Sequence, residues 1–166
     1  HEQVFGDTPA GFSYRFPAVD SGQFRVSGPY GERSYSGGLV ESEALTVPVE
    51  ITNVGDRAGA YDLRFSNNGE IVATRSGRLD AGASTSQSVT VAFERLGRHR
   101  LSTGDDSLTV SVREPAALVV TNLTANQTGT DRERIRVTAT VLNPTTRPGA
   151  ETIAIGQDGT ELVGER

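Results

Sequence analysis

The 166-residue chain has no cysteine, methionine or tryptophan, and all 16 of its basic residues are arginine. Without cysteine it forms no disulfide, no thiolate nucleophile and no cysteine-based metal site. It contains no run of 18 apolar residues, so the sequence predicts no membrane-spanning helix. Aromatic residues make up only 6% of the chain. A core of valine, isoleucine and leucine is therefore expected, rather than a large apolar ligand cavity.

The charge pattern bears on partners and source. The formal net charge is −5, and the arginines occur singly, with no basic stripe interleaved with aromatics. Nucleic acid is therefore not an expected partner. Arginine without lysine is typical of GC-rich genomes, and acidity without lysine is common in salt-adapted proteins. Our interpretation of this composition is a salt-loving archaeal source.

Short runs of alternating apolar and polar residues fill most of the chain, with glycine, asparagine, aspartate and serine between them. A period of two is typical of antiparallel sheets, and many short strands at close spacing indicate an all-β sandwich. Asn67-Asn68-Gly69 predicts a hairpin turn. Because proline cannot donate to a ladder, Pro48 predicts an edge strand or a bulge. The clearest runs are 45–51, 61–65, 71–75, 88–93, 99–102, 107–112, 118–120, 135–142 and 152–155.

An internal repeat is the most informative feature of the sequence. Shifting the chain by 90 residues aligns 43–76 with 133–166 without a gap. A period of this length corresponds to one immunoglobulin-like domain, so the sequence predicts immunoglobulin-like repeats. The matched residues include Glu43 with Glu133, Val47 with Val137, Asn53 with Asn143, Arg57 with Arg147, Gly59 with Gly149, and Gly69 with Gly159.

The second repeat is incomplete, because it stops where the first copy reaches Ser76. It therefore lacks about three strands, and half a sandwich exposes apolar faces and unpaired edges. Two explanations stay open at this point: the sequence is a fragment of a longer repeat protein, or another chain supplies the missing strands by donor-strand complementation. The apolar face that would accept such strands comprises Ile135, Val137, Val141, Ile153 and Ile155.

We divide the chain into a strand-rich segment at 1–38, an immunoglobulin-like sandwich at 39–115 and a partial second repeat at 116–166. The first segment holds four of the six phenylalanines and three of the four tyrosines. Within it Phe12, Tyr14 and Phe16 alternate, so an extended strand would project all three from one face. This suits a strand donated to a neighbouring chain, and it equally suits an ordinary first core strand. A separate cap and the end of a preceding domain are further interpretations.

Residues 45–112 resemble the CARDB group of immunoglobulin-like modules, a cell-adhesion-related domain of bacterial and archaeal surface proteins. The resemblance is carried by strand 45–51, the connection 52–59, strand 61–65, the Asn68-Gly69 hairpin and the loop Leu79-Asp80-Ala81-Gly82. Residues 118–163 look like the first half of a second copy, although Pro144-Thr145 replaces Val54-Gly55. The resemblance implies a seven-stranded sandwich used as a spacer, stalk or adhesive module, and it carries over no catalytic residue.

Catalysis and metal binding have little support in the sequence. His1 and His99 have no partner at metal-ligand spacing, and His99 is expected on a strand surface between two arginines. Glu41 and Glu43 form a carboxylate pair of the kind that is usually solvated. Calcium is conceivable at Asp105-Asp106, or near Asp7 and Asp20, but the loop at 103–107 equally suits a plain turn. We therefore expect no enzyme, no cofactor and no metal.

Two N-glycosylation acceptors, Asn122 and Asn126, stand close together at the start of the second repeat. Taken together, these features predict a non-enzymatic extracellular protein of the cell surface, with an adhesive or structural role as a stalk or filament subunit. Its expected partners are copies of itself, with glycans possible. The alternative is a carbohydrate-binding accessory module of a secreted protein, which needs exposed aromatics on a sheet face. Its candidates are Tyr14, Tyr30, Tyr35 and Tyr61.

Overall fold

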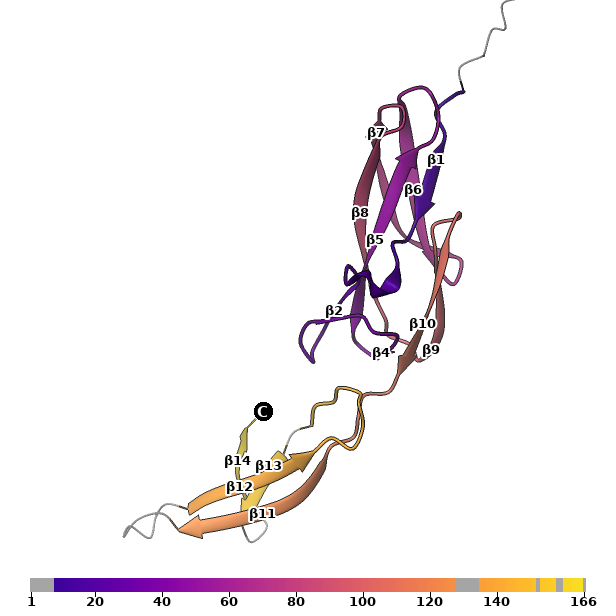
Figure 1. Ribbon diagram of the computed structural model, residues 1–166. Helices are drawn as coiled ribbons and strands as arrows, with labels where there is room; N and C mark the ends of the chain where they lie inside the picture. The colour runs from indigo at the N-terminus through magenta and orange to yellow at the C-terminus, as the bar shows by residue number, and fades with distance from the viewer. Residues whose placement is uncertain (1–7, 128–134, 152, 158–159, 166) are drawn as a thin grey trace, which may run out of the picture. The chain divides into compact units, whose positions relative to one another are not determined.

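The computed structural model describes residues 8–127, 135–151, 153–157 and 160–165 of the chain, which is all-β and divides into two compact units. The first unit covers 1–113 and the second covers 114–166. The described part of the segment predicted at 1–38 belongs to the first unit, where it contributes strands to the sandwich (Figure 1).

One sheet of the first unit is built around β5 (Ala44–Asn53). Along one edge β5 pairs with β8 (Ser84–Ala92) over its whole length. Its other edge is shared by two strands: β1 (Phe12–Arg15) pairs with residues 50–53 and β2 (Arg25–Ser27) with residues 44–46. β3 (Arg33–Ser34) then pairs with β2. A single 3-10 turn, η1 (Val19–Ser21), lies between β1 and β2.

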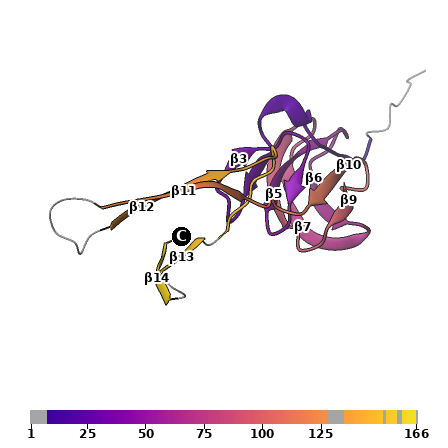
Figure 2. The same ribbon diagram turned by 90° about the horizontal axis from the view of Figure 1, so that it is seen from below.

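The second sheet of this unit has the strand order β4-β10-β9-β6-β7. The hairpin of β6 (Gly59–Asn67) and β7 (Glu70–Leu79) forms one side of this sheet. From β6 the sheet continues through β9 (Gly97–Ser102) and β10 (Ser107–Arg113) to β4 (Leu39–Val40). All of these pairings are antiparallel except β4 with β10, which is parallel. Figures 1 and 2 show the two sheets facing each other as layers.

The core lies between these layers and is closed by side chains from both sheets. The alternating positions of β5, namely Leu45, Val47, Val49 and Ile51, are all fully buried. Across the layer they meet Leu63 and Phe65 of β6, Leu101 of β9, and Val110 and Val112 of β10. Period-two patterning thus produces one buried and one solvated face on each strand.

The predicted turn at 67–69 is confirmed, because Asn68 and Gly69 both have positive φ (51° and 88°) between β6 and β7. The prediction for Pro48 is wrong, because Pro48 lies in central strand β5, paired with Ser88 without a bulge. The N–H of Asn53 points to β8 and that of Val54 to the β1 side. By alternation an N–H at position 48 would point to the edge that β1 and β2 share. Neither of these strands pairs with residues 47–49, so the proline removes no ladder hydrogen bond there.

The chain enters and leaves the first unit at opposite ends of the sandwich (Figure 1). At one end Asp56 N–H donates to Thr8 O (3.1 Å), beside the last residue of β5. At the other end Glu41 N–H donates to Arg113 O (2.9 Å), beside the first residues of β5. The ten residues of β5 separate these ends by roughly 33 Å at about 3.3 Å per residue.

The second unit contains two two-stranded ribbons. β11 (Val119–Gln127) pairs with β12 (Ile135–Leu142), with a bulge between Val120 and Asn122. β13 (Ile153–Gln157) pairs with β14 (Thr160–Glu165). Ala116 N–H donates to Pro148 O (2.9 Å), and this contact lies against Gly149, where any side chain would collide with the Ala116 carbonyl.

The 90-residue repeat is visible in the strand register. Ile153 pairs with Glu165 as Leu63 pairs with Arg75, and Gln157 pairs with Thr160 as Asn67 pairs with Glu70. Each hairpin has its register shift at the same place, after Ile155 and after Phe65. The loop asparagine is also reproduced: its Nδ2 donates over 2.7 Å to the carbonyl of Arg57 in the first copy and of Arg147 in the second.

Candidate functional site

The candidate site is the apolar face of the β11–β12 ribbon. Ile135 and Val141 of β12 are 56% and 41% exposed, whereas their counterparts Leu45 and Ile51 in β5 are fully buried. Val137, the counterpart of Val47, is half-buried. Of the other two predicted face residues, Ile153 is half-buried, and the side chain of Ile155 lies outside the described residues.

The difference follows from which strands are present. In the first unit β8 occupies one whole edge of β5, and β9 pairs with β6 at Ser66 and Asn67. In the described part of the second unit no strand pairs with the corresponding edge of β12, and none pairs with β13 except β14. Figures 1 and 2 show the two ribbons without a further strand at these edges. An unpaired edge next to an apolar face is a template for strand addition.

β11 extends the same apolar face. Residues directly opposite in an antiparallel pair place their side chains on the same side of the sheet. Leu123 pairs with Ala139, Ala125 with Val137, and Val120 with Val141. Leu123 is 61% exposed and Val120 is 47% exposed. The ribbon therefore presents a continuous apolar surface built by both strands.

Both glycosylation candidates lie on the opposite, polar face of this ribbon. Asn122 pairs with Thr140 and Asn126 with Arg136, so their side chains share a side with these polar residues. Both asparagines are exposed. Whether they carry glycans stays a prediction, but a glycan at either site would project away from the apolar face.

The candidate exchange segment is in use within its own sandwich. Phe12 packs edge-on against Tyr61, and Phe16 packs edge-on against Phe65, at centroid distances of 6.1 and 6.0 Å. By its pairing with β5, β1 corresponds to β11, which pairs with β12 in the second unit. The position that β1 occupies is therefore filled in the C-terminal unit, and donation of Phe12, Tyr14 and Phe16 to a neighbour stays a prediction.

The loop between β9 and β10 fastens β1 from its other side. Tyr14 N–H donates to Asp105 Oδ2 (3.0 Å), and Phe16 N–H donates to Asp106 Oδ2 (2.9 Å). The hydroxyl of Thr103 donates to Tyr14 O (3.1 Å). Burial raises the pKa of the Tyr14 phenol, and the N–H of Asp62, which donates to its oxygen, partly offsets that rise. The two carboxylates considered as calcium ligands thus serve as acceptors for the backbone of β1.

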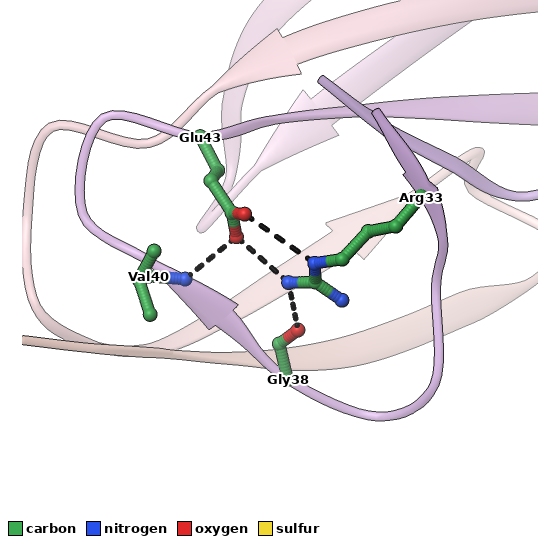
Figure 3. A network of polar contacts seen from close by, with 4 residues as sticks. All are labelled: Arg33, Gly38, Val40 and Glu43. Carbon is green, nitrogen blue, oxygen red and sulfur yellow. Dashed lines mark hydrogen bonds and ion pairs between the residues drawn. The ribbon is translucent and has the colours of Figure 1, made fainter. Parts of the chain in front are cut away.

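A partly buried ion pair between Arg33 and Glu43 lies near Glu41, at the end of the unit where the chain leaves. Figure 3 shows its contacts. Glu43 is 1% exposed, and its Oε2 accepts from Arg33 Nη2 (2.8 Å) and from Val40 N–H (2.9 Å). Arg33 Nη2 also donates to Gly38 O (3.0 Å). The expectation of a solvated Glu41 and Glu43 pair is wrong for Glu43, because Arg33 neutralises its charge inside the fold.

His99 is also buried, which corrects the expected surface position. Its Nδ1 lies 3.2 Å from Asn67 Oδ1 and its Nε2 lies 2.9 Å from Arg95 O, and its ring packs edge-on against Phe93. Within the described residues no group of three or more His, Cys, Asp or Glu side chains is placed to hold a metal. His1 and Asp7 lie outside those residues, and Asp20 is exposed in η1. No helix in the described part is long and apolar enough to cross a membrane.

The four tyrosines do not form an exposed platform. Tyr61 and Tyr35 are buried in the core, at 5% and 8% exposure, and burial raises the pKa of the Tyr35 phenol. Tyr14 and Tyr30 are partly buried. The aromatic surface expected of a carbohydrate-binding sheet face is therefore limited to two side chains on separate segments.

No protein-family model matches the chain, and no curated protein matches it in sequence. Solved structures similar to it include beta-glucosidase from Listeria innocua in complex with gluconolactone, at 18% identity and a TM-score of 0.48, covering 65% of this chain and 17% of that chain. A mutant of that beta-glucosidase in complex with laminaribiose gives 19% identity and a TM-score of 0.47, covering 66% and 17%. The present chain thus spans 17% of the length of these proteins.

Proposed function

We propose that the chain is a non-enzymatic, extracellular spacer of a cell surface, a stalk or filament module that bears load along its strands. The observation that carries this proposal is the position of the two chain ends of the first unit, at opposite ends of the sandwich. Tension applied to the chain then acts parallel to β1 and β10. A strand under such tension can slide out only if its ladder hydrogen bonds break together.

Tension on the chain would act on β1 and on β10, and each of these strands is held by hydrogen bonds on both of its edges. At the N-terminal side β1 is held by β5 and by Asp105 and Asp106. At the C-terminal side β10 is held by β9 and by the parallel strand β4, and the pairing with β4 ends in the bond from Glu41 N–H to Arg113 O. The tandem repeat supports the same role, because a spacer is lengthened by adding copies of one module.

Single-molecule force spectroscopy of the full chain between handle domains tests the proposal. The expected trace has a distinct unfolding peak that releases about 300–350 Å of chain, the extended length of the first unit minus its folded length. Glu41→Pro is the matched variant. Ser42 has positive φ (72°) and Glu43 N–H donates to Val40 O, so Glu41 occupies a turn position that proline favours.

Glu41→Pro therefore keeps the turn and removes the N–H donor to Arg113 together with the Glu41 carboxylate, and we expect it to lower the unfolding force. A chain that extends without a force peak, or a variant that unfolds at unchanged force, would contradict a load-bearing role. Labelling of intact source cells with an antibody to the chain tests the location, and labelling seen only after lysis would refute the surface assignment.

A further inference from the structure

We propose that the open edge of β12 is a strand-acceptor site, and that its partner is a polypeptide segment with the strand pattern of residues 84–113. The first unit contains the template for this site, because β8 is seated on the equivalent edge of β5. This inference does not depend on the load-bearing role proposed above.

The backbone of β12 is oriented to receive such a strand. In β5 the odd-numbered residues direct their N–H groups toward β8, as Asn53 does in donating to Ala83 O. Val54, the even-numbered residue that follows β5, donates instead to Gly11 O on the β1 side. A shift of 90 residues preserves this parity, so by the same alternation the even-numbered residues of β12 direct their N–H groups toward β11. Ile135, Val137, Ala139 and Val141 therefore direct their N–H groups to the open edge. The ladder with β11 does not use these groups.

The register of β8 on β5 specifies the side chains that the partner needs. Val91 lies opposite Leu45 and Val89 opposite Val47, whereas Gln87 and Thr85 lie opposite Val49 and Ile51. Transferred to β12, the partner strand needs apolar residues opposite Ile135 and Val137 and tolerates polar ones further along. On the solvated face Arg136 replaces Thr46, which hydrogen-bonds Thr90 (2.8 Å). An acidic residue at the position of Thr90 is therefore favoured in the partner.

The partner needs more than one strand, because two edges in the described part of the second unit are open, one on β12 and one on β13. In the first unit β8 covers β5, and β9 and β10 continue the sheet that begins with β6. A second copy of this chain supplies neither component readily. Its own β8 is paired along nine residues, and removing that strand would expose Val89 and Val91. Joining two copies edge to edge through β12 would pair the backbones but leave both apolar faces uncovered.

The test is an extended chain, in which a copy of residues 77–113 follows Arg166. Ser76 is the counterpart of Arg166, so residue 77 is the next position of the repeat. We expect amide exchange in β11 and β12 to slow at least tenfold relative to the unextended chain, with a monomeric mass by light scattering. In the control extension the residues copied from Val89, Val91 and Phe93 are changed to serine, and we expect no such slowing.

A second variant tests the seat itself. Val137→Pro in the extended chain removes an N–H from the open edge and none from the ladder with β11, so we expect it to abolish the added protection. The proposal is overturned if the extended chain exchanges as fast as its serine control. It is equally overturned if Val137→Pro leaves the protection intact, or if the unextended chain forms dimers that already protect β12.

Discussion

Glu43 joins three segments of the first unit through one carboxylate. Its two oxygens bind Arg33 of β3, and one of them also accepts the N–H of Val40 in β4. Placing a charge inside a protein costs several kcal/mol unless it is paired and hydrogen-bonded. Arg33, which is one-third exposed, pairs with the charge and remains in contact with water. This residue therefore fixes where β4 lies, and so where β10 is held.

We expect Glu43→Gln to destabilise the first unit by about 2–3 kcal/mol, because it removes the charge that balances a partly buried Arg33. Equilibrium unfolding in urea measures the change. Asp62→Asn is the matched control, since Asp62 and Arg64 form an ion pair in which both side chains are more than half exposed. It should cost less than about 1 kcal/mol. Equal losses in the two variants would contradict a special role for the buried pair.

Single residues were also where sequence reasoning failed. Alternation placed the apolar core positions correctly, because burial on a strand follows a period of two. It did not place Glu43 or His99, because their surroundings depend on distant partners. Arg33 lies ten residues before Glu43, outside the range 45–112 that carries the family resemblance. His99 of β9 contacts Asn67 of the neighbouring strand β6. The sequence around Glu43 carries no local signal that an arginine from another segment will pair with it.

Among the elements, β1 depends most on contacts beyond its own ladder. It has only four residues, and one of its edges is held by side-chain carboxylates rather than by another strand. Gly55 adds a packing requirement where the chain enters the sandwich, because any side chain there would collide with the Pro9 carbonyl. The start of the sandwich is thus fastened by specific groups, each of which can be removed separately.

We expect the double substitution of Asp105 and Asp106 by alanine to loosen β1 while the rest of the sandwich stays folded. Each lost charge-assisted bond costs about 1–2 kcal/mol, which is enough to open a four-residue strand. Amide exchange at Tyr14 and Phe16 should accelerate at least tenfold, whereas the amides of β5 opposite β8 should not change. Asp20→Ala, at an exposed acidic residue of η1, is the control. Acceleration in that control as well would contradict the assigned role of the two carboxylates.

The strand pattern predicted most elements, but not how they pair. The hairpin at Asn68-Gly69 was predictable because its turn chemistry is local. The division of one β5 edge between β1 and β2 was not, since it depends on the path through η1. Pro48 was misassigned for this reason: its missing donor faces a gap between two partner strands, and the sequence of β5 alone does not reveal that gap.

At the scale of the whole chain, the two units differ in how far their apolar residues are covered. The core of the first unit draws its buried residues from 24–112, so it closes without any side chain from the second unit. The second unit repeats the register of the first and leaves apolar residues exposed. Sequence comparison matched Ile135 and Val141 with Leu45 and Ile51, and only the structure shows that the first two are exposed while the last two are buried.

We expect residues 8–113 alone to unfold at the same urea midpoint as the first unit does within the full chain. The physical reason is that every residue of the buried core cluster lies within that fragment. Circular dichroism during urea titration measures the midpoint, and a proton–nitrogen NMR spectrum shows whether the fragment has one native state. A midpoint clearly below that of the full chain would mean that the second unit contributes to this core.

The two sides of the β11–β12 ribbon differ in chemistry, and this has a practical consequence. The side with Asn122, Thr138 and Thr140 carries polar side chains, whereas a strand added at the open edge of β12 would help to cover the opposite, apolar side. An antibody fragment raised against this polar side would label the chain without covering its apolar side, where the added strand would pack.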